Sequence, residues 1–509
     1  MSTSENNKRI AKNTLMLYIR MLITMVVGLY TSRVVLQTLG VEDYGIYAVV
    51  GGIVSMFTFL NGGMGSATQR YLNFELGRGN QEQLSKVFST SLQIHFLISL
   101  VVLLLSETIG LWFLYEKLVI PAERLDAAFW VFQFSIIACV VNIISVPYNA
   151  AIVAHEKMSA FAYISILEVV LKLLIVYLLY ISPWDNLIVY AALLLCVSLL
   201  MRWIYASYSK KHFHEAHYKH QVDKSLFKEM FSFSGWSLWG NLAAMLYSQG
   251  LNMMLNIFFG PMVNAARGIA LQVQGVVQGF VGNFQIALNP QITKNYASGA
   301  LDQMHNLMFR SARFSFFLLF LLALPILIEA NYILHLWLGG IPDDTVVFMR
   351  WIIGVSLIYT IANPCMIANQ ATGKVKVYQA VVGGILLLIL PASYVVLLLG
   401  APAYSVFIVH FCVECIAQFA RMYMLRNLIN LPLRAYIKNI YVPILMVVIV
   451  SVFLPIIVHL QLVEGFIRFI CVGIVCLASV VTTIFFLGLT NVERHFFIEK
   501  IQNVVFRRI

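Results

Sequence analysis

The sequence predicts an all-α integral membrane protein with about fourteen transmembrane helices, and its composition, its apolar runs and an internal repeat support this. Of its 509 residues, 60% are hydrophobic and 11% are charged, whereas soluble domains are about 45–50% apolar and about 25% charged. A surface this apolar would aggregate in water, so we expect a bilayer around it. A spanning helix needs roughly 20 apolar residues, which leaves room for about 12–14 spans.

Fourteen apolar segments follow one another along the chain. Several exceed the length of a perpendicular span, which indicates tilt or extension beyond the bilayer. The polar start precedes an apolar run that is too long for a cleavable signal peptide. The segments cover residues 11–38, 44–76, 85–115, 127–154, 159–182, 185–208, 227–259, 263–297, 307–335, 346–371, 376–399, 402–428, 436–460 and 464–489.

The basic residues fix the orientation. A net charge of +11 would suggest nucleic-acid binding in a soluble protein, but here it fits the excess of Lys and Arg that marks cytoplasmic loops. With the N-terminus inside, most bases, Arg421 among them, fall on cytoplasmic flanks, so we expect both termini inside. The exceptions are Arg20, Arg33, Lys117, Arg124, Lys172, Arg267, Arg350 and Arg468.

The chain repeats two of its features at nearly the same spacing. Gly79 and Gly299, each after an even-numbered segment, lie 220 residues apart. Pro147 and Pro364, each shortly before a lysine, lie 217 residues apart. We therefore expect two duplicated six-helix lobes with the same orientation and the substrate between them.

The repeat predicts four parts. Residues 1–208 form the first lobe, 209–226 a basic cytoplasmic linker, 227–428 the second lobe, and 429–509 two further helices and a cytoplasmic tail. We interpret the linker as solvated and close to anionic headgroups. No metal site is predicted, because neither the linker histidines nor the Cys-x-x-Cys pair in the twelfth segment matches zinc spacing; these residues are His212, His214, His217, His220, Cys412 and Cys415.

Several passages resemble one family of transporters. Residues 31–40 (TSRVVLQTLG) and 43–47 (DYGIY) resemble the opening of polysaccharide-export and O-antigen-type flippases. Residues 61–70 (NGGMGSATQR) and the two proline-to-lysine passages, 147–157 and 364–374, are similar to the same group. The sequence therefore resembles the multidrug/oligosaccharidyl-lipid/polysaccharide (MOP) exporter superfamily over nearly its whole length.

The resemblance implies a MATE/MOP-like fold in which two lobes rock around a cavity. It implies transport of undecaprenyl-pyrophosphate-linked glycans across the bacterial inner membrane, with cationic residues contacting the pyrophosphate. It also implies partners: membrane lipids, the glycolipid, a polysaccharide polymerase and glycosyltransferases, without nucleic acid. The two appended helices depart from many members and resemble the lipid II flippase branch, where the last two helices form a lipid-facing groove.

Ionisable residues inside spans are functional candidates, because the bilayer penalises charge. Arg20 lies about two turns inside the first segment, on much the same face as Thr24 and Thr31. A guanidinium there could donate paired hydrogen bonds to a pyrophosphate, or could extend to the inner headgroups instead. Arg33 lies on another face of that helix and either contacts substrate or anchors the outer interface.

Two further bases are candidate substrate contacts. Arg267 opens the eighth segment among small residues that permit close helix approach. Arg70 lies at the inner end of the second segment and either contacts substrate or only anchors the topology.

Two acids within spans are candidates for ion coupling. Glu168 and Lys172 have the i, i+4 spacing at which such a pair can meet on one helix, which predicts either a neutralised buried pair or a headgroup or coupling-ion site. Glu414 has no obvious local partner, so it could be protonated, could pair with a base on another span, or could bind a coupling ion. We expect no cofactor beyond a coupling H+ or Na+.

Three other classes of function remain open beside the flippase. A drug or cation antiporter of the same fold would need dominant acids within its spans, where this chain has few. A membrane-embedded glycosyltransferase or polymerase would need catalytic acids or histidines on a sizeable outer loop, whereas Asp343 and Asp344 lie on a short one. A structural scaffold would give no reason for charges inside spans. We therefore expect no enzymatic activity.

Overall fold

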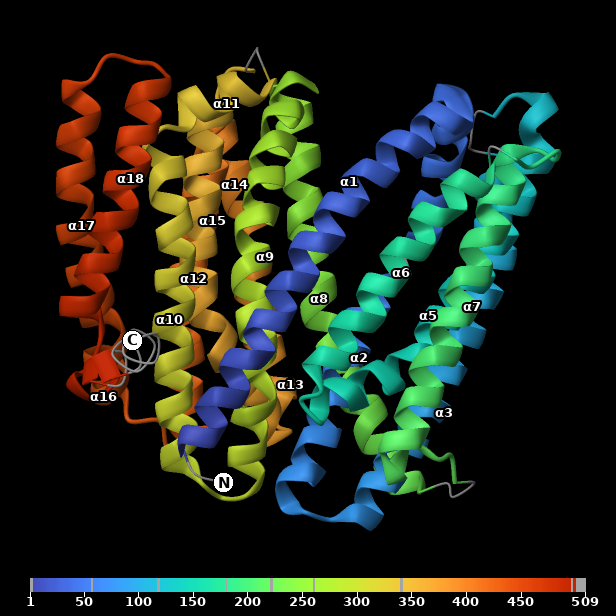
Figure 1. The fold of residues 1–509 in the computed structure, drawn as a ribbon, viewed down its shortest axis with the longest axis horizontal. Coiled ribbons are helices and arrows are strands. Elements are labelled where there is room, and N and C mark those ends of the chain that lie inside the picture. Colours follow the sequence, from blue (N-terminus) through green and yellow to red (C-terminus); the bar gives the residue numbers. More distant parts are fainter. Residues whose placement is uncertain are drawn as a thin grey trace, which may run out of the picture. The chain divides into compact units, whose positions relative to one another are not determined.

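The computed structural model describes residues 3–55, 58–116, 120–179, 181–219, 223–259, 261–338, 342–495 and 498–499. All regular structure in these ranges is helical (Figure 1). Eleven helices in these ranges are long and apolar enough to cross a membrane, which makes the chain a multi-pass membrane protein. Because α1, α2 and α9 are not among these eleven, the count of fourteen spans and the duplicated lobes stay predictions.

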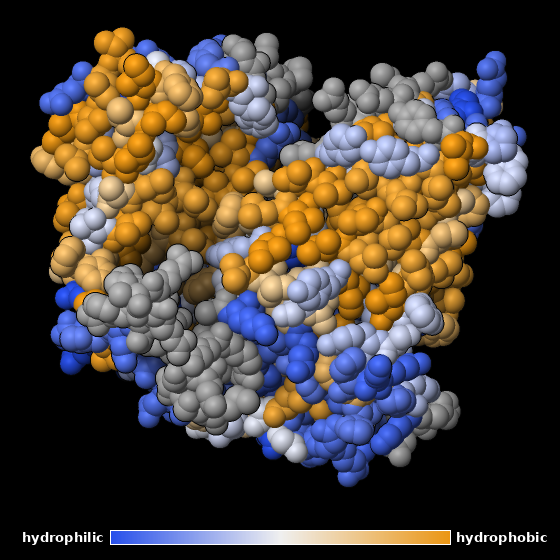
Figure 2. Space-filling model, viewed as in Figure 1, coloured by the Kyte–Doolittle hydropathy of each residue, from blue (hydrophilic) through white to orange (hydrophobic). Residues whose placement is uncertain are grey.

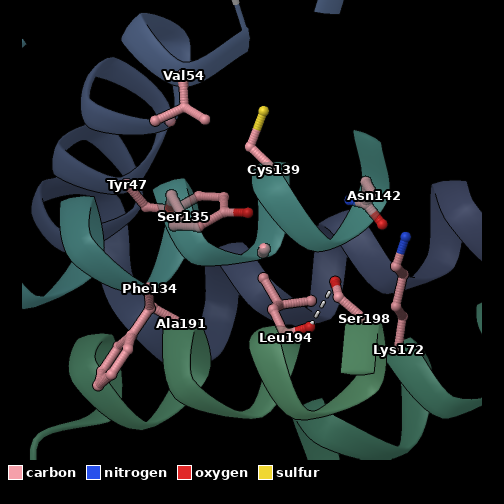
Figure 3. Close-up of a pocket in the computed structure, with 12 residues that line it drawn as sticks. Tyr47, Val54, Phe134, Ser135, Cys139, Asn142, Lys172, Ala191, Leu194 and Ser198 are labelled. Atoms are coloured by element: carbon pink, nitrogen blue, oxygen red, sulfur yellow. Dashed lines mark hydrogen bonds between the residues drawn. The ribbon is translucent and has the colours of Figure 1, made fainter. Parts of the chain in front are cut away.

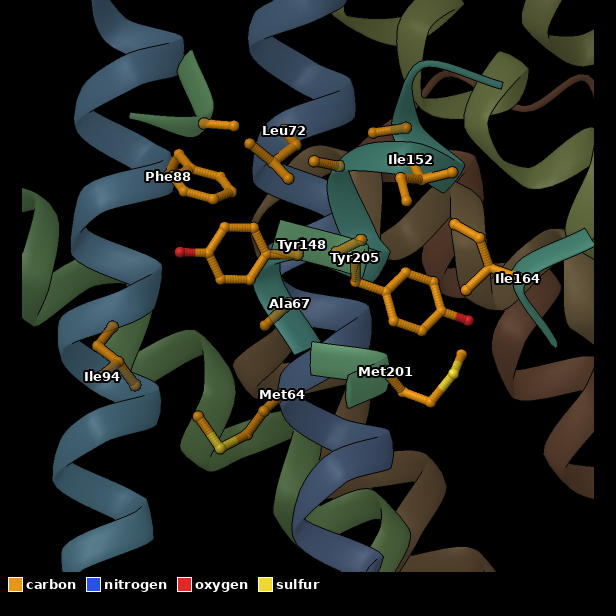
Figure 4. Close-up of a cluster of buried hydrophobic side chains, with 14 of the residues drawn as sticks. Met64, Ala67, Leu72, Phe88, Ile94, Tyr148, Ile152, Ile164, Met201 and Tyr205 are labelled. Atoms are coloured by element: carbon orange, nitrogen blue, oxygen red, sulfur yellow. The ribbon is translucent and has the colours of Figure 1, made fainter. Parts of the chain in front are cut away.

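The first of two compact units contains Met1–Leu242, Ile286–Ala300 and Gly373–Ala380. Its core lies among α2, α3, α5 and α7, where the rings of Phe88 and Tyr148 meet edge to face at 5.3 Å (Figure 4). Its helices are α1 (Thr3–Ser55), α2 (Thr58–Arg78), α3 (Gln81–Leu105), α4 (Leu111–Glu116), α5 (Leu125–Ala154), α6 (Met158–Leu179), α7 (Asn186–His212) and the first part of α8 (Lys224–Phe259).

The second unit contains Ala243–Gln285, Leu301–Thr372 and Val381–Ile509. Its core includes Phe348 and Phe407, whose ring centroids lie 4.7 Å apart. Beyond its part of α8, its helices are α9 (Pro261–Ala297, shared with the first unit), α10 (Leu301–Ile328), α11 (Ala330–Leu338), α12 (Thr345–Thr372), α13 (Val375–Leu387, also shared), α14 (Ile389–Leu398), α15 (Ser405–Leu428), α16 (Leu433–Tyr436), α17 (Val442–Gln461) and α18 (Phe466–Thr483). The four-part division expected from the sequence stays a prediction.

Two helix boundaries differ from the expected ones. Helix α1 continues through residues 39–43, where the sequence predicted the end of the first segment. Its 53 residues would measure about 80 Å when straight, against roughly 30 Å of hydrocarbon, so α1 exceeds one crossing. The eleventh segment is divided at Leu388 into α13 and α14, because the ring of Pro391 clashes with the carbonyl group four residues earlier.

The exposed surface is largely apolar, as a lipid-facing surface should be. Large hydrophobic side chains stay exposed on many spans, among them Ile257, Phe419, Ile449 and Phe453. On the face in Figure 2, hydrophobic residues cover the long sides of the helices and hydrophilic residues gather near helix ends. This distribution fits helices that cross a bilayer.

An ion-pair cluster in the first unit joins α1 to the starts of α5 and α7. Arg124, just before α5, bonds to Asp43 of α1 and to Asp185, whose carboxylate lies 2.5 Å away. Asp185 also caps α7 by accepting from the backbone N–H groups of Leu187 and Ile188. Arg124, in the loop before α5, therefore links α1, α5 and α7.

A second polar contact holds the loop after α7. His155, which follows α5, pairs with the buried carboxylate of Glu215 and stacks on Phe213 with ring centroids 4.1 Å apart. Gln81 at the start of α3 donates to the same carboxylate at 3.3 Å. Glu215 thus connects the loop to the ends of α3 and α5.

Lowering the pH is expected to loosen this loop. Burial disfavours the Glu215 carboxylate, but hydrogen bonds from His155, the backbone and Gln81 outweigh it and hold the pKa of Glu215 below its ordinary value of 4.5. Stabilisation from a lowered carboxyl pKa is present above the ordinary value and is lost as the pH falls through the folded-state pKa. The protection factors of the Phe213 and Ala216 amides against hydrogen exchange should therefore fall between about pH 6 and about pH 3. An identical pH response in a Glu215→Gln chain would contradict this assignment.

Candidate functional site

Helix α6 carries polar side chains along one face in the first unit. Phe161, Ser165, Glu168 and Lys172 follow the i, i+4, i+7, i+11 spacing that places residues on a single helical stripe. The Lys172 ammonium lies 2.6 Å from Glu168 Oε1, so the predicted i, i+4 pair forms. Both side chains remain partly exposed, at 42% and 34%, and can still meet a ligand.

Arg20 of α1 adds a second base to this stripe. Its guanidinium lies over the ring of Phe161, 4.8 Å from the centroid, and within electrostatic range of Glu168 and Tyr205. Cation–π contact favours Arg in this position. Arg20 and Lys172 thus share one acid, so the stripe carries one net positive charge within the membrane-spanning part of this unit.

A cavity of about 320 Å³ opens beside this stripe (Figure 3). Its wall residues recur at helical spacing on α1, α5 and α7, with Lys172 contributed by α6. Such spacing turns a single face of each helix toward the cavity. The wall consists of Tyr47, Gly51, Val54, Phe134, Ser135, Ala138, Cys139, Asn142, Lys172, Ala191, Leu194 and Ser198.

Neutral polar groups dominate the chemistry of the wall. Asn142 is exposed and makes no hydrogen bond among the described residues, so its amide can both donate and accept. Ser198 donates to the Leu194 carbonyl oxygen at 3.0 Å, which leaves its oxygen as an acceptor. The described residues contain no group of His, Cys, Asp and Glu that could hold a metal ion.

Arg267 occupies a buried position in the second unit, where its hydrogen-bond acceptors among the described residues are neutral oxygens. It donates to Asn252 Oδ1 at 3.1 Å, and to the carbonyl and hydroxyl oxygens of Ser248 at 3.0 and 3.1 Å. The side chain is 8% exposed. Neutral partners orient the guanidinium without cancelling its charge.

Glu414 has a partner that the sequence interpretation did not identify. Its carboxylate lies 2.6 Å from Nη1 of Arg421 on the same helix, and the two side chains are only 4% and 2% exposed. Arg421 had been counted among the bases on cytoplasmic flanks; the structure shows it buried in the second unit, and its side of the membrane stays a prediction. His410, one turn from Glu414, packs edge to face against Tyr247 of α8 and lies within range of Glu414 and Arg267.

Arg70 is buried among aromatic rings in the C-terminal half of α2. Its guanidinium lies 4.4 Å from the Tyr71 ring centroid and 4.8 Å from that of Phe74. It also packs against Gly373, which follows α12. These contacts make Arg70 part of the fold at this end of the unit, and substrate contact by Arg70 stays a prediction. The side chain of Arg33 lies outside the described part of the structure.

Replacing Gly373 by alanine is expected to lower the thermal unfolding midpoint. Gly373 has φ +76°, and an added Cβ would lie 2.7 Å from Arg70 Nη2. The left-handed backbone alone costs a non-glycine residue about 1–2 kcal/mol. The matched control is Gly384→Ala, where an added Cβ has no heavy atom within 4 Å and φ is not positive. Equal midpoints for the two variants would contradict the assigned packing.

A protein-family model and several solved structures match the chain. The model described as "Polysaccharide biosynthesis protein" covers residues 10–295, more than half of the sequence. No curated protein sequence matches the chain.

The similar structures are transporters. An outward-facing multidrug resistance MATE family transporter of the MOP superfamily is 14% identical, with a TM-score of 0.70 over 84% of this chain and 96% of that chain. A MATE structure in the bent conformation is 13% identical, with a TM-score of 0.71 over 85% and 97%. A MOP superfamily transporter from Pyrococcus furiosus, described by a binding pocket of reverse polarity that suggests a different function, is 13% identical, with a TM-score of 0.69 over 85% and 96%. At these identities the likeness shows a MATE-like fold.

Proposed function

The chain belongs to the polysaccharide biosynthesis protein family of MOP-type transporters, and from this premise we propose that it is a lipid-linked oligosaccharide flippase. It moves an undecaprenyl-pyrophosphate-linked unit of an O-antigen, capsule or exopolysaccharide from the cytoplasmic to the periplasmic leaflet by alternating access. It works in the bacterial inner membrane with both termini in the cytoplasm. Its partners are the glycolipid, membrane lipids, and the polymerase and glycosyltransferases of the same pathway.

The main support is the excess of positive charge inside the spans. Arg20 and Lys172 both lie close to Glu168, and the hydrogen-bond acceptors of Arg267 among the described residues are neutral oxygens. A dianionic pyrophosphate would supply the missing negative charge and accept paired hydrogen bonds from a guanidinium. In this proposal Arg20, Arg33, Arg70, Lys172 and Arg267 contact the glycolipid during its passage.

Transport needs an energy source, and we assign it to H+ or Na+. The candidate acids are Glu168 and Glu414. Glu414 lies close to Arg421 and His410, so ion binding would compete with an existing pair. Glu414→Gln should therefore change the ion dependence of transport, and unchanged ion dependence would remove Glu414 from coupling.

The alternative is an ion-coupled drug or cation antiporter with the same fold. A cation carrier needs carboxylates that a cation can approach without competition from a fixed base. Both acids that the sequence placed within spans are paired with one, Glu168 with Lys172 and Glu414 with Arg421. This pairing favours the flippase.

Deleting the gene in its host tests the proposal. We expect surface polysaccharide to disappear and the lipid-linked precursor to accumulate in the membrane, both reversed when the intact chain is supplied. Unchanged surface polysaccharide would contradict the proposal. Unchanged polysaccharide together with hypersensitivity to cationic drugs would favour the antiporter.

A further inference from the structure

We propose that the cavity in the first unit is a saccharide subsite, which receives one sugar ring of the transported glycan. This inference rests on the flippase function and adds a location for part of the cargo. The cavity wall includes the side chains of Tyr47, Asn142, Lys172 and Ser198 and one face of α5 (Figure 3). The phosphate groups of the glycolipid bind elsewhere, at guanidinium groups outside this wall.

The α5 face offers a row of small and neutral groups. Ser135, Ala138, Cys139 and Asn142 follow the i, i+3, i+4, i+7 spacing, so they form one stripe along the cavity. Ser135 and Asn142 make no hydrogen bond among the described residues. Their hydroxyl and amide groups can each both donate and accept, and so can the hydroxyl groups of a sugar.

Aromatic surface completes the wall. Tyr47 on α1 packs edge to face against Tyr190 of α7, with ring centroids 5.0 Å apart, so its position is set by the fold. Phe134 lies at the other end of the cavity from Asn142 and Lys172 (Figure 3). An aromatic body beside hydrogen-bonding groups matches the alternating apolar and hydroxylated surface of a pyranose.

The charge in the wall favours a neutral ligand. Lys172 is the single basic side chain among the described residues that line the cavity, and its ammonium bonds to Glu168 at 2.6 Å. A phosphate in the cavity would meet the opposing field of Glu168 as well as that of Lys172. Among the described residues that line the cavity none carries a carboxylate, so a cation would find no counter-charge in the wall. A sugar hydroxyl group can accept from the ammonium without disturbing the pair.

The size of the cavity sets the amount of cargo. A volume of about 320 Å³ lies at the lower end of the roughly 300–1,000 Å³ that small-molecule sites have. A cavity of this size suits one sugar ring, and we expect the rest of an oligosaccharide to lie outside it.

Cys139 provides a reporter inside the wall. The experiment uses the full chain in lipid nanodiscs, with the other six cysteines replaced by serine or alanine and export activity confirmed. The rate at which a small water-soluble methanethiosulfonate modifies Cys139 is measured with and without roughly 100 mM of one monosaccharide. At this concentration a sugar with a Kd of ~10 mM slows the reaction roughly tenfold. The sugars are glucose, galactose, mannose, rhamnose and N-acetylglucosamine, with glycerol and inorganic pyrophosphate as comparators.

The expected result is protection of Cys139 by at least one sugar, beyond the effect of glycerol. Asn142→Leu and Ser198→Ala should abolish the protection, whereas Ile137→Ala on the same helix, outside the wall, should keep it. A chain that retains only Cys196, which is exposed on α7 outside the wall and therefore faces lipid, should show no sugar-dependent change and little reaction with the water-soluble reagent. Thermal unfolding of each variant separates lost binding from lost folding.

Three outcomes would overturn the saccharide subsite. They are a Cys139 that does not react, protection by sugars no greater than by glycerol, and protection by pyrophosphate alone, which would make the cavity an anion subsite. None of these affects export by the unaltered chain, so they are distinguishable from a failure of the flippase proposal, which the gene deletion detects.

Discussion

Replacing Glu414 by alanine is expected to lower the free energy of unfolding by about 3–5 kcal/mol, the range for breaking a buried ion pair by removing one partner. The variant leaves the guanidinium of Arg421, whose side chain is 2% exposed, without its carboxylate in the interior of the second unit. Burying a charge without its counter-charge is far costlier than burying the pair. Unfolding of the purified chain in detergent, followed by helix content against denaturant, measures the difference.

The double variant Glu414→Met/Arg421→Met distinguishes the effect of leaving Arg421 unpaired from the effect of changing residue 414. Removing both charges leaves no isolated charge, so this chain should regain most of the stability that Glu414→Ala loses. A matched control is Glu82→Ala, which breaks the exposed pair with Lys86 and should change the stability little, because solvent screens an exposed pair. If Glu414→Ala were no more destabilising than Glu82→Ala, the buried pair would not have the role assigned to it.

Replacing Arg20 by alanine is expected to slow glycolipid flipping roughly 10- to 100-fold. Hydrogen bonds to charged groups contribute about 1.5–3 kcal/mol each, and each 1.4 kcal/mol corresponds to about tenfold. Arg20→Lys keeps the charge but loses the paired donors, so its flipping rate should lie between those of alanine and arginine. The measurement is surface polysaccharide at equal membrane levels of each variant.

Arg78→Ala is the control for Arg20. Arg78 is an exposed base at the end of α2, where it lies over the ring of Phe74, and its loss should leave flipping nearly unchanged. Full export by the Arg20→Ala chain would remove Arg20 from the transport mechanism, whatever the Arg78 control does.

Much of the fold could be predicted from the sequence, because hydropathy and helical spacing are local properties. The apolar runs anticipate the positions of most helices, and the i, i+4 spacing anticipates the Glu168–Lys172 pair. The continuation of α1 through residues 39–43 could not be predicted, because Gly40 suggested a break that the surrounding helix overrides.

The Glu414–Arg421 pair shows why the candidate sites were harder to predict. A seven-residue separation spans two helical turns, so the pair forms only because the long arginine side chain is directed back along a buried face. The positive-inside pattern placed Arg421 on a cytoplasmic flank but could not predict its burial, since charge counting contains no information on burial.

The cavity depends on four helices that are distant in the sequence. Its one local signal was the row of small and polar residues on α5, including Ser135, Cys139 and Asn142 at i, i+4 and i+7. That spacing predicts a polar stripe, but not whether the stripe faces another helix, lipid or a ligand. The packing of α1, α6 and α7 around the stripe decides this, and it is a tertiary property.

The most direct test is a flipping assay with the purified chain. Proteoliposomes are loaded with undecaprenyl-pyrophosphate-linked glycan from the host, and the fraction of the glycan that an external lectin or glycosidase can reach is followed over time, with and without H+ and Na+ gradients. The flippase proposal predicts that the intact chain moves glycolipid between leaflets faster than protein-free vesicles and faster than the Arg20→Ala chain. Equal rates in all three preparations, under every gradient, would contradict it.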